Sequence, residues 1–327
     1  MHVGLIGSTD PDTFADNIGD ALVRMGHSVT SLGSARPKFR AGLLLRSAEL
    51  TRQACPGWED RTHKVLAYRA RDRGCQAVIT TDGGLAPAAI AEIRKNRIPV
   101  SLWFPDCVTN LGRQRMLAAP YTGLFFKDRL LVQRLKDMLD LPVWHLPEAC
   151  NPGWHRPIGD AGVDKHVVVA GNTYLTRLLL LERLHDAGVP LVLYGNPIPR
   201  WAPKAIPDAL HTGRPIFREE KSRVFRGAAA VLNNLHPAEM SGVNARLFEA
   251  AGAGAAVLCE RRPELDELFD PKREVVAFTT FDELLGKIQD LLSSGSRTRS
   301  IGDAATKRAH ADHSYDVRLK ILLEKMF

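Results

Sequence analysis

Short apolar runs alternate with stretches of helical periodicity in the first part of the chain. The run HVGLI at 2–6 is followed by a Gly-Ser turn and then by FADNIGDALVRMG at 14–26, where apolar residues recur at helical spacing. Gly26 stands where a helix ends, and the apolar run HSVTSL follows it. The pattern predicts a strand, a helix and a second strand.

The same alternation continues to residue 146. After the second strand, at 27–32, further strands are predicted at 76–81, 99–104, 122–126 and 142–146, and helices at 87–96 and 128–138. Apolar runs without polar alternation are typical of strands covered on both faces, as in parallel sheets. We therefore expect a doubly wound α/β domain over residues 1–150.

A second α/β pattern begins after a segment at 146–162 that is rich in Pro and Gly, which we interpret as a linker. It predicts strands at 165–171, 190–195, 228–233, 255–260 and 274–278, and helices at 174–187, 281–295, 297–311 and 314–327. We expect a second doubly wound domain over 160–313. Two such domains would place a cleft between two sets of strand carboxyl ends, where ligands of these sheets bind.

Composition adds few constraints. The 327 residues are 45% hydrophobic and 25% charged, with no depleted region and no apolar run long enough to span a bilayer. We expect an ordered cytoplasmic protein that meets a membrane only peripherally, if at all. The net charge of +7 favours an anionic ligand, although a mildly basic solvated surface explains it too. Five single cysteines without a CxxC pair do not favour structural zinc or a disulfide framework.

The segment SGVNARLFEAAGAGAAVLCE, at 241–260, contains the most informative chemistry. A loop of small residues leads into a helix that begins between Val243 and Ala245, and such a helix start suits a phosphate or pyrophosphate. Gly242 and Asn244 allow an anion to approach, and Arg246 adds a charged donor. Glu249, an unpaired carboxylate by sequence, would accept hydrogen bonds from ribose hydroxyls. The alternative is a surface residue on an amphipathic helix.

Several motifs resemble one family. GVNARLFEAAGAGAAVLCE, ELDELFDPKREVVAFTTFDELLGKIQDLL and HSYDVRLKILLEKM resemble the C-terminal half of GT-B glycosyltransferases. The similarity is to the "glycosyl transferases group 1" members related to spore maturation proteins, and VVVAGNTYLTRLLLLERL and VPLVLYGNP resemble the opening strands of the same domain. The resemblance covers about 165–327. It implies the GT-B fold, two Rossmann-like domains facing a central cleft, with the last helix crossing back to the N-terminal domain.

The resemblance also implies a donor site. In many retaining members two glutamates, with seven residues between them, face the donor, and the second bonds the nucleotide ribose. Glu249 matches the second, Ser241 stands in place of the first, and Glu239 is a displaced candidate. The implied donor-binding residues are Gly171, Asn172, Arg177, Tyr194, Gly195, Ser241, Gly242, Val243, Asn244, Ala245, Arg246 and Glu249.

Candidate catalytic groups lie in both halves. Arg177 or Arg246 would stabilise the charge that develops on a nucleoside diphosphate leaving group, although Arg177 also fits a solvent-facing position in a Leu-rich helix. Asp106, after a strand end, is a candidate base or sugar-hydroxyl partner, and equally a helix-capping residue. Gly7 and Ser8 follow the first strand, where they face the acceptor side or form an ordinary turn.

We expect no resident cofactor and no obligatory metal. Asp10 and Asp12 superficially match a DxD motif but read as loop chemistry, and His310, Asp312 and His313 read as a solvated helix end rather than a metal site. His145 and His155, near the linker, are typical packing or hinge residues.

Taken together, the sequence predicts a glycosyltransferase that moves a sugar from a nucleoside-diphosphate donor, its co-substrate, to an acceptor hydroxyl or amine. The resemblance favours retention of configuration, and the acceptor is left open among polysaccharide, protein, lipid and small natural product. Two alternatives are a nucleotide-sugar epimerase on the same architecture and a basic nucleotide or nucleic-acid binder without turnover.

Overall fold

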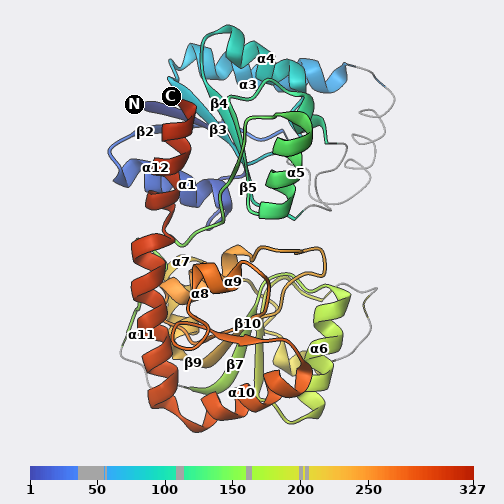
Figure 1. The fold of residues 1–327 in the computed structure, drawn as a ribbon, viewed down its shortest axis with the longest axis vertical. Coiled ribbons are helices and arrows are strands. Elements are labelled where there is room, and N and C mark those ends of the chain that lie inside the picture. The colour runs from blue at the N-terminus through green and yellow to red at the C-terminus, as the bar shows by residue number, and fades with distance from the viewer. Residues whose placement is uncertain (36–54, 56, 108–113, 160–163, 199–201, 203–205) are drawn as a thin grey trace. The chain divides into compact units, whose positions relative to one another are not determined.

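A computed structural model describes residues 1–327 except 36–54, 56, 108–113, 160–163, 199–201 and 203–205. The chain divides into two compact units (Figure 1). Unit 1 comprises Met1–Pro147 together with Arg318–Phe327, and unit 2 comprises Glu148–Val317. Residues 148–159 of the segment predicted as a linker belong to unit 2, where Asn151 and His155 are fully buried.

Unit 1 is built on a parallel sheet of six strands, in the order β2-β1-β3-β4-β5-β6. Its strands are β1 (His2–Ile6), β2 (Ser28–Gly33), β3 (Ala77–Thr80), β4 (Val100–Phe104), β5 (Gly123–Phe126) and β6 (Val143–His145). Its helical segments are α1 (Phe14–Arg24), α3 (Trp58–Asp72), α4 (Pro87–Lys95), the 3-10 turn η2 (Arg115–Ala118) and α5 (Arg129–Leu139). All the predicted strands and helices are confirmed here, while α3 and η2 were not predicted.

Unit 2 is built on a parallel sheet of five strands, in the order β11-β10-β9-β7-β8. Its strands are β7 (Asp164–Ala170), β8 (Leu191–Tyr194), β9 (Ala228–Asn233), β10 (Val257–Glu260) and β11 (Val276–Phe278). Its helical segments are α6 (Leu175–Asp186), η3 (Asp208–Leu210), α7 (Arg218–Gly227), α8 (Ala245–Gly252), α9 (Leu265–Leu268), α10 (Phe281–Ser293) and α11 (Gly295–Asp312). The segments η3, α7 and α9 were not predicted. The last helix, α12 (Tyr315–Met326), begins in unit 2 and ends in unit 1.

Alternate residues of the unit 2 strands belong to two separate hydrophobic layers. Val168 of β7 packs in the layer that includes α8 and α11, whereas its neighbours Val167 and Val169 pack in the layer that includes α6 and α10. Successive side chains of a strand point to opposite faces, so helices cover this sheet on both faces. The continuous apolar runs of the sequence are thereby explained, and the predicted doubly wound α/β class is confirmed.

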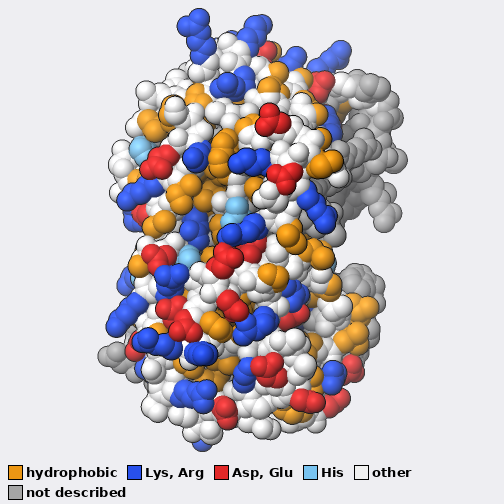
Figure 2. Space-filling model, in the orientation of Figure 1, with side chains coloured by type: hydrophobic (Ala, Val, Ile, Leu, Met, Phe, Trp, Pro, Cys, Tyr) orange, Lys and Arg blue, Asp and Glu red, His pale blue; other side chains and the backbone are white. Residues whose placement is uncertain are grey.

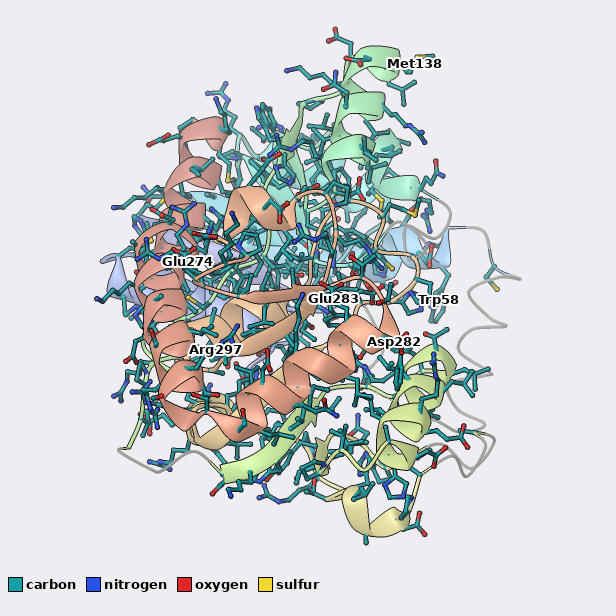
Figure 3. The ribbon with its side chains drawn as sticks, turned by 60° about the horizontal axis from the view of Figure 1, so that its bottom comes forward. Trp58, Met138, Glu274, Asp282, Glu283 and Arg297 are labelled. Atoms are coloured by element: carbon teal, nitrogen blue, oxygen red, sulfur yellow. The ribbon has the colours of Figure 1, made fainter. Side chains whose placement is uncertain are left out.

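Capping residues mark where helices start and end. Thr280 accepts a hydrogen bond from the Glu283 N–H at the start of α10, where Asp282 and Glu283 place negative charge in the first turn (Figure 3). After α1, Gly26 adopts a φ of +84°, a left-handed conformation in which a side chain is strained. The predicted end of this helix is confirmed.

Unit 2 has its two chain ends side by side. The Cys150 N–H donates to the His313 carbonyl (2.9 Å), and the Cys150 carbonyl accepts from the Tyr315 N–H (2.9 Å). Cys150 and Ser314 thus form an isolated parallel bridge. The chain enters and leaves unit 2 through two hydrogen-bonded neighbours.

The charged surface is mixed. On the face in Figure 2, Lys and Arg side chains are interspersed with Asp and Glu, and no broad basic tract covers it. Among the helices in the described part of the chain, none is sufficiently long and apolar to cross a bilayer.

Candidate donor-binding site

The strand order of unit 2 defines where a ligand is expected. The chain starts the sheet at β7, places β8 on one side of it and β9 on the other, and so reverses direction between β7 and β9. Ligands of open α/β sheets bind at the carboxyl edge beside such a reversal. Gly171 follows β7, Gly195 follows β8 and Asn234 follows β9, so three strand ends contribute to this edge.

Gly171 and Gly195 bring two of these strand ends into close contact. The Gly171 N–H donates to the Tyr194 carbonyl (2.9 Å), and Gly171 has a φ of +120°. A Cβ atom placed on Gly195 would lie 2.4 Å from the Gly171 carbonyl oxygen, too close for any side chain. Both glycines were predicted on the donor side, and the structure places them together at the sheet edge with Tyr194.

Arg177 is fixed in this edge by three hydrogen bonds. Its Nε donates to Asn234 Oδ1 (2.9 Å), its Nη2 to the Asn234 carbonyl (3.1 Å) and its Nη1 to the Asn172 carbonyl (2.7 Å). The guanidinium lies 4.6 Å from the centre of the Tyr174 ring. The side chain is buried, so the alternative of a solvent-facing arginine is wrong.

Arg246, in the first turn of α8, approaches the same place. A Cβ atom on Gly171 would lie 3.3 Å from Arg246 Nη2 and 3.5 Å from Arg177 Nη1, so both guanidinium groups lie against this glycine. Burial lowers the pKa of Arg177; its interactions with Tyr174 raise that pKa, and the positive charge of Arg246 lowers it. An arginine remains protonated under these conditions, so two cations stand side by side.

The start of α8 has buried polar atoms that make no hydrogen bond to any other residue that the structure describes. Asn244 is the N-cap residue, but its side chain makes no capping hydrogen bond. Its Oδ1 atom and the Nε atom of Arg246 are both buried, and neither has a hydrogen-bond partner in the described part of the chain. Unsatisfied buried groups of this kind are typical places for water or a ligand. The preceding residues Ser241, Gly242 and Val243 are buried, and Ala245 is the first helical residue.

Glu249 is buried in α8, but it is not unpaired, which corrects the expectation from sequence. Its Oε2 accepts from Arg246 Nη1 (2.6 Å) and lies 3.1 Å from Lys221 Nζ. The partner Arg246, three residues earlier, is visible in the sequence. Lys221 was missed because α7 was not predicted. Its signal is the four-residue spacing from Lys221 to Phe225, both buried on one side of that helix.

Ser241, where a glutamate was expected from the resemblance, binds a different carboxylate. Its Oγ donates to Glu264 Oε1 (2.7 Å), and its carbonyl accepts from the Glu264 N–H (3.1 Å). Glu264 is buried and was not singled out from sequence. Glu239 is also buried, and its carbonyl accepts from Arg262 Nε (2.7 Å).

The candidates of unit 1 lie at the carboxyl edge of its own sheet. Gly7 follows β1, where its N–H donates to the Gly33 carbonyl (2.9 Å). Ser8 donates to Asp10 Oδ2 (2.7 Å) and its carbonyl accepts from Thr13 Oγ1 (2.6 Å), which is the turn that starts α1. Asp106 follows β4, is exposed, and accepts from the Cys107 N–H (3.0 Å). Asp106 was alternatively expected to cap the next helix; residues 108–113, which follow it, lie outside the described residues.

The weaker candidates make local contacts. His310 Nε2 lies 2.8 Å from the His155 carbonyl, His313 Nε2 lies 2.6 Å from the Leu268 carbonyl, and Asp312 accepts from Arg308 (2.6 Å). His313 is buried rather than solvated, which corrects that part of the expectation. Asp12 accepts from Asn17 Nδ2 (3.3 Å), in keeping with loop chemistry, and His145 Nε2 lies 3.2 Å from the Lys127 carbonyl.

Comparison with known proteins gives one family match and several structures of the same fold. Residues 177–324 match the family described as "Glycosyl transferase-like". No curated protein matches the chain by sequence. The C-terminal part of the chain is thus glycosyltransferase-like in sequence, whereas the match does not single out the subgroup related to spore maturation proteins, which stays a prediction.

Solved structures show the same fold over nearly the whole chain. A sucrose-phosphate synthase from Thermosynechococcus elongatus is 14% identical, with 99% of this chain and 98% of that chain covered and a TM-score of 0.68. The E. coli trehalose-6-phosphate protein bound with UDP-2-fluoro glucose is 12% identical, with 100% and 99% covered and a TM-score of 0.66. HepE of Anabaena in complex with UDP is 12% identical, with 99% and 98% covered and a TM-score of 0.60. The predicted GT-B fold class is confirmed.

Proposed function

We propose that this protein is a glycosyltransferase whose unit 2 holds a nucleoside-diphosphate sugar and transfers the sugar to an acceptor hydroxyl or amine. The observation that carries the proposal is the meeting of Arg177 and Arg246 at Gly171, beside the start of α8. Two neighbouring cations, of which Arg177 is buried, repel each other, and a diphosphate between them would remove that repulsion. The match of residues 177–324 to the glycosyl transferase-like family supports the same assignment.

Arg177 is suited to assist the departure of the diphosphate. A guanidinium has five N–H donors, and three of them hold Asn234 and Asn172. The group is therefore oriented before the ligand arrives, and its charge meets the negative charge that develops as the glycosidic bond to phosphate breaks. Fixed donors of this kind stabilise a transition state because little reorganisation is needed. The α8 N–H groups after Asn244 would share this task.

Glu249 remains the proposed partner of the ribose hydroxyls. It lies one helical turn beyond the α8 start, and two cations compensate its negative charge in the absence of a nucleotide. The finer proposals are retention of configuration, no obligatory metal and an acceptor held by unit 1 near Gly7, Ser8 and Asp106. The arginines supply at the phosphates the positive charge that a metal ion would otherwise supply.

A ligand panel tests the function directly. The full chain is heated with UDP, GDP, TDP, ADP and their sugars, and one base is expected to raise the melting temperature. At a ligand concentration of 100 times Kd the stabilisation is about 2.7 kcal/mol. Incubation with the matching donor alone should then release nucleoside diphosphate slowly. A new epimer would instead support an epimerase, and salt-sensitive DNA binding without any nucleotide shift would overturn the proposal.

Glu249→Gln is expected to weaken nucleotide binding and to lower stability, because the variant leaves two cations without their shared carboxylate. The sharper measurement compares a nucleoside diphosphate with its 2′,3′-dideoxy analogue. The wild type should lose about tenfold in affinity for the analogue, equal to roughly 1.4 kcal/mol. The variant should bind both ligands equally. If the wild type and the variant preferred the nucleoside diphosphate over its analogue by the same factor, Glu249 would not bind the ribose hydroxyls.

A further inference from the structure

Lys221 places a cation where α7 would ordinarily bury an apolar side chain. The residue is 5% exposed and shares the buried side of the helix with Ser222 and Phe225. Its Nζ lies 3.1 Å from Glu249 Oε2. A buried ammonium group is costly unless it is paired, and an apolar residue at this position would avoid the cost. The ion pair therefore calls for an explanation other than packing.

The carboxylate oxygen that Lys221 contacts also holds Arg246. Glu249 Oε2 is 2.6 Å from Arg246 Nη1 and 3.1 Å from Lys221 Nζ. One negative charge thus faces two positive charges. The two cations differ in their surroundings, since the Arg246 side chain is 22% exposed and the Lys221 side chain 6%. Arg246 lies on the more open side, next to Gly171 and Arg177, whereas Lys221 is enclosed.

We propose that Lys221 is a positioning residue for the donor site: it keeps Glu249 compensated while Arg246 transfers its contact from Glu249 to an anion beside Gly171. This inference rests on the proposed function. If Glu249 had Arg246 as its single cation, an approaching phosphate would have to compete with a buried carboxylate for the same guanidinium. With Lys221 in place, Arg246 can turn to the phosphate and leave Glu249 paired and correctly placed.

The inference predicts that Lys221 affects a ligand that it does not touch. Lys221→Met is expected to weaken the binding of the nucleoside diphosphate by about tenfold, because Arg246 then stays with Glu249. Lys221→Arg, which restores the cation, is expected to recover most of the affinity. Arg223→Met, an exposed position on the same helix, is the matched control and should bind as the wild type does.

Calorimetric titration of the full chain tests the role of Lys221. The ligands are the nucleoside diphosphate selected by the panel and its 2′,3′-dideoxy analogue. The Lys221→Met/Glu249→Gln double variant removes both charges of the ion pair. Its loss of affinity for the nucleoside diphosphate should not exceed the loss caused by Glu249→Gln alone. That comparison serves even if Lys221→Met does not fold. Two results would overturn the role of Lys221. One is wild-type affinity in folded Lys221→Met; the other is a double variant in which the losses of binding free energy of the two single variants add. A wild type that binds no nucleoside diphosphate would instead overturn the proposed function.

Discussion

Replacing Arg177 with alanine is expected to lower the affinity for the nucleoside diphosphate by on the order of 100-fold, since about two charge-assisted hydrogen bonds to phosphate are lost. The rate at which the donor sugar releases its nucleotide should also fall, because a fixed cation no longer stabilises the negative charge that develops on the diphosphate. Stability should also fall by about 3 kcal/mol, because two buried acceptors of Asn234, the side-chain Oδ1 and the carbonyl oxygen, lose their donor.

Binding and stability are separated by two companion variants. Arg177→Lys retains the charge but not the planar fork, and it should recover only part of the affinity. Arg183→Ala, on the same helix, removes an exposed guanidinium that lies 3.8 Å from the centre of the Phe281 ring, and it should leave binding unchanged. If folded Arg177→Ala bound the diphosphate within twofold of wild type, Arg177 would be a structural residue and not a donor ligand.

Gly195→Ala is expected to remove donor binding through the backbone. The new Cβ would lie 2.4 Å from the Gly171 carbonyl oxygen, so the ends of β7 and β8 must separate and Gly171 must shift relative to the two arginines. Overpacking of this kind costs about 2 kcal/mol, which corresponds to a melting temperature lower by roughly 4–8 °C. Thermal unfolding and diphosphate titration measure both effects.

The matched control is Gly286→Ala, in α10 of the same unit. Apart from the neighbouring backbone of α10 itself, no described atom lies within 4 Å of the added Cβ, and the position is exposed and helical. Alanine there should raise the free energy of unfolding by about 1 kcal/mol, since glycine is the poorer helix former. A Gly195→Ala protein with normal stability and normal affinity would show that the close approach of the two strand ends is not needed for the site.

The strands were predictable because their apolar runs are short, continuous and bounded by turn residues. Helices α3 and α7 were not, because charged residues dominate both and each buries a narrow face, in α3 chiefly Leu66, Ala67 and Ala70. In α7 one of the few buried positions is itself charged. A pattern of apolar spacing cannot indicate a helix whose buried side carries Lys221.

Part of the site was predictable because some of its residues lie at helical spacing within one helix. Glu249 and Arg246 are three residues apart on one helix, and the burial of Arg177 is implied by its spacing to Leu181 and Leu184. The contacts of Glu249 with Lys221 and of Ser241 with Glu264 join different elements. Local periodicity contains no information about which helix packs beside which, so these partners became visible only in the folded chain.

The paired ends of unit 2 have an evolutionary consequence. Since Cys150 and Ser314 are bridged, Glu148–Val317 is an insertion within unit 1, whose own chain resumes at Arg318. Inserted domains with adjacent ends are readily accommodated by their hosts. Every proposed donor contact lies within that one uninterrupted segment. Exchange of that one segment between related genes would therefore move all the proposed donor residues together, and unit 1 would keep its sheet and its final helical turns.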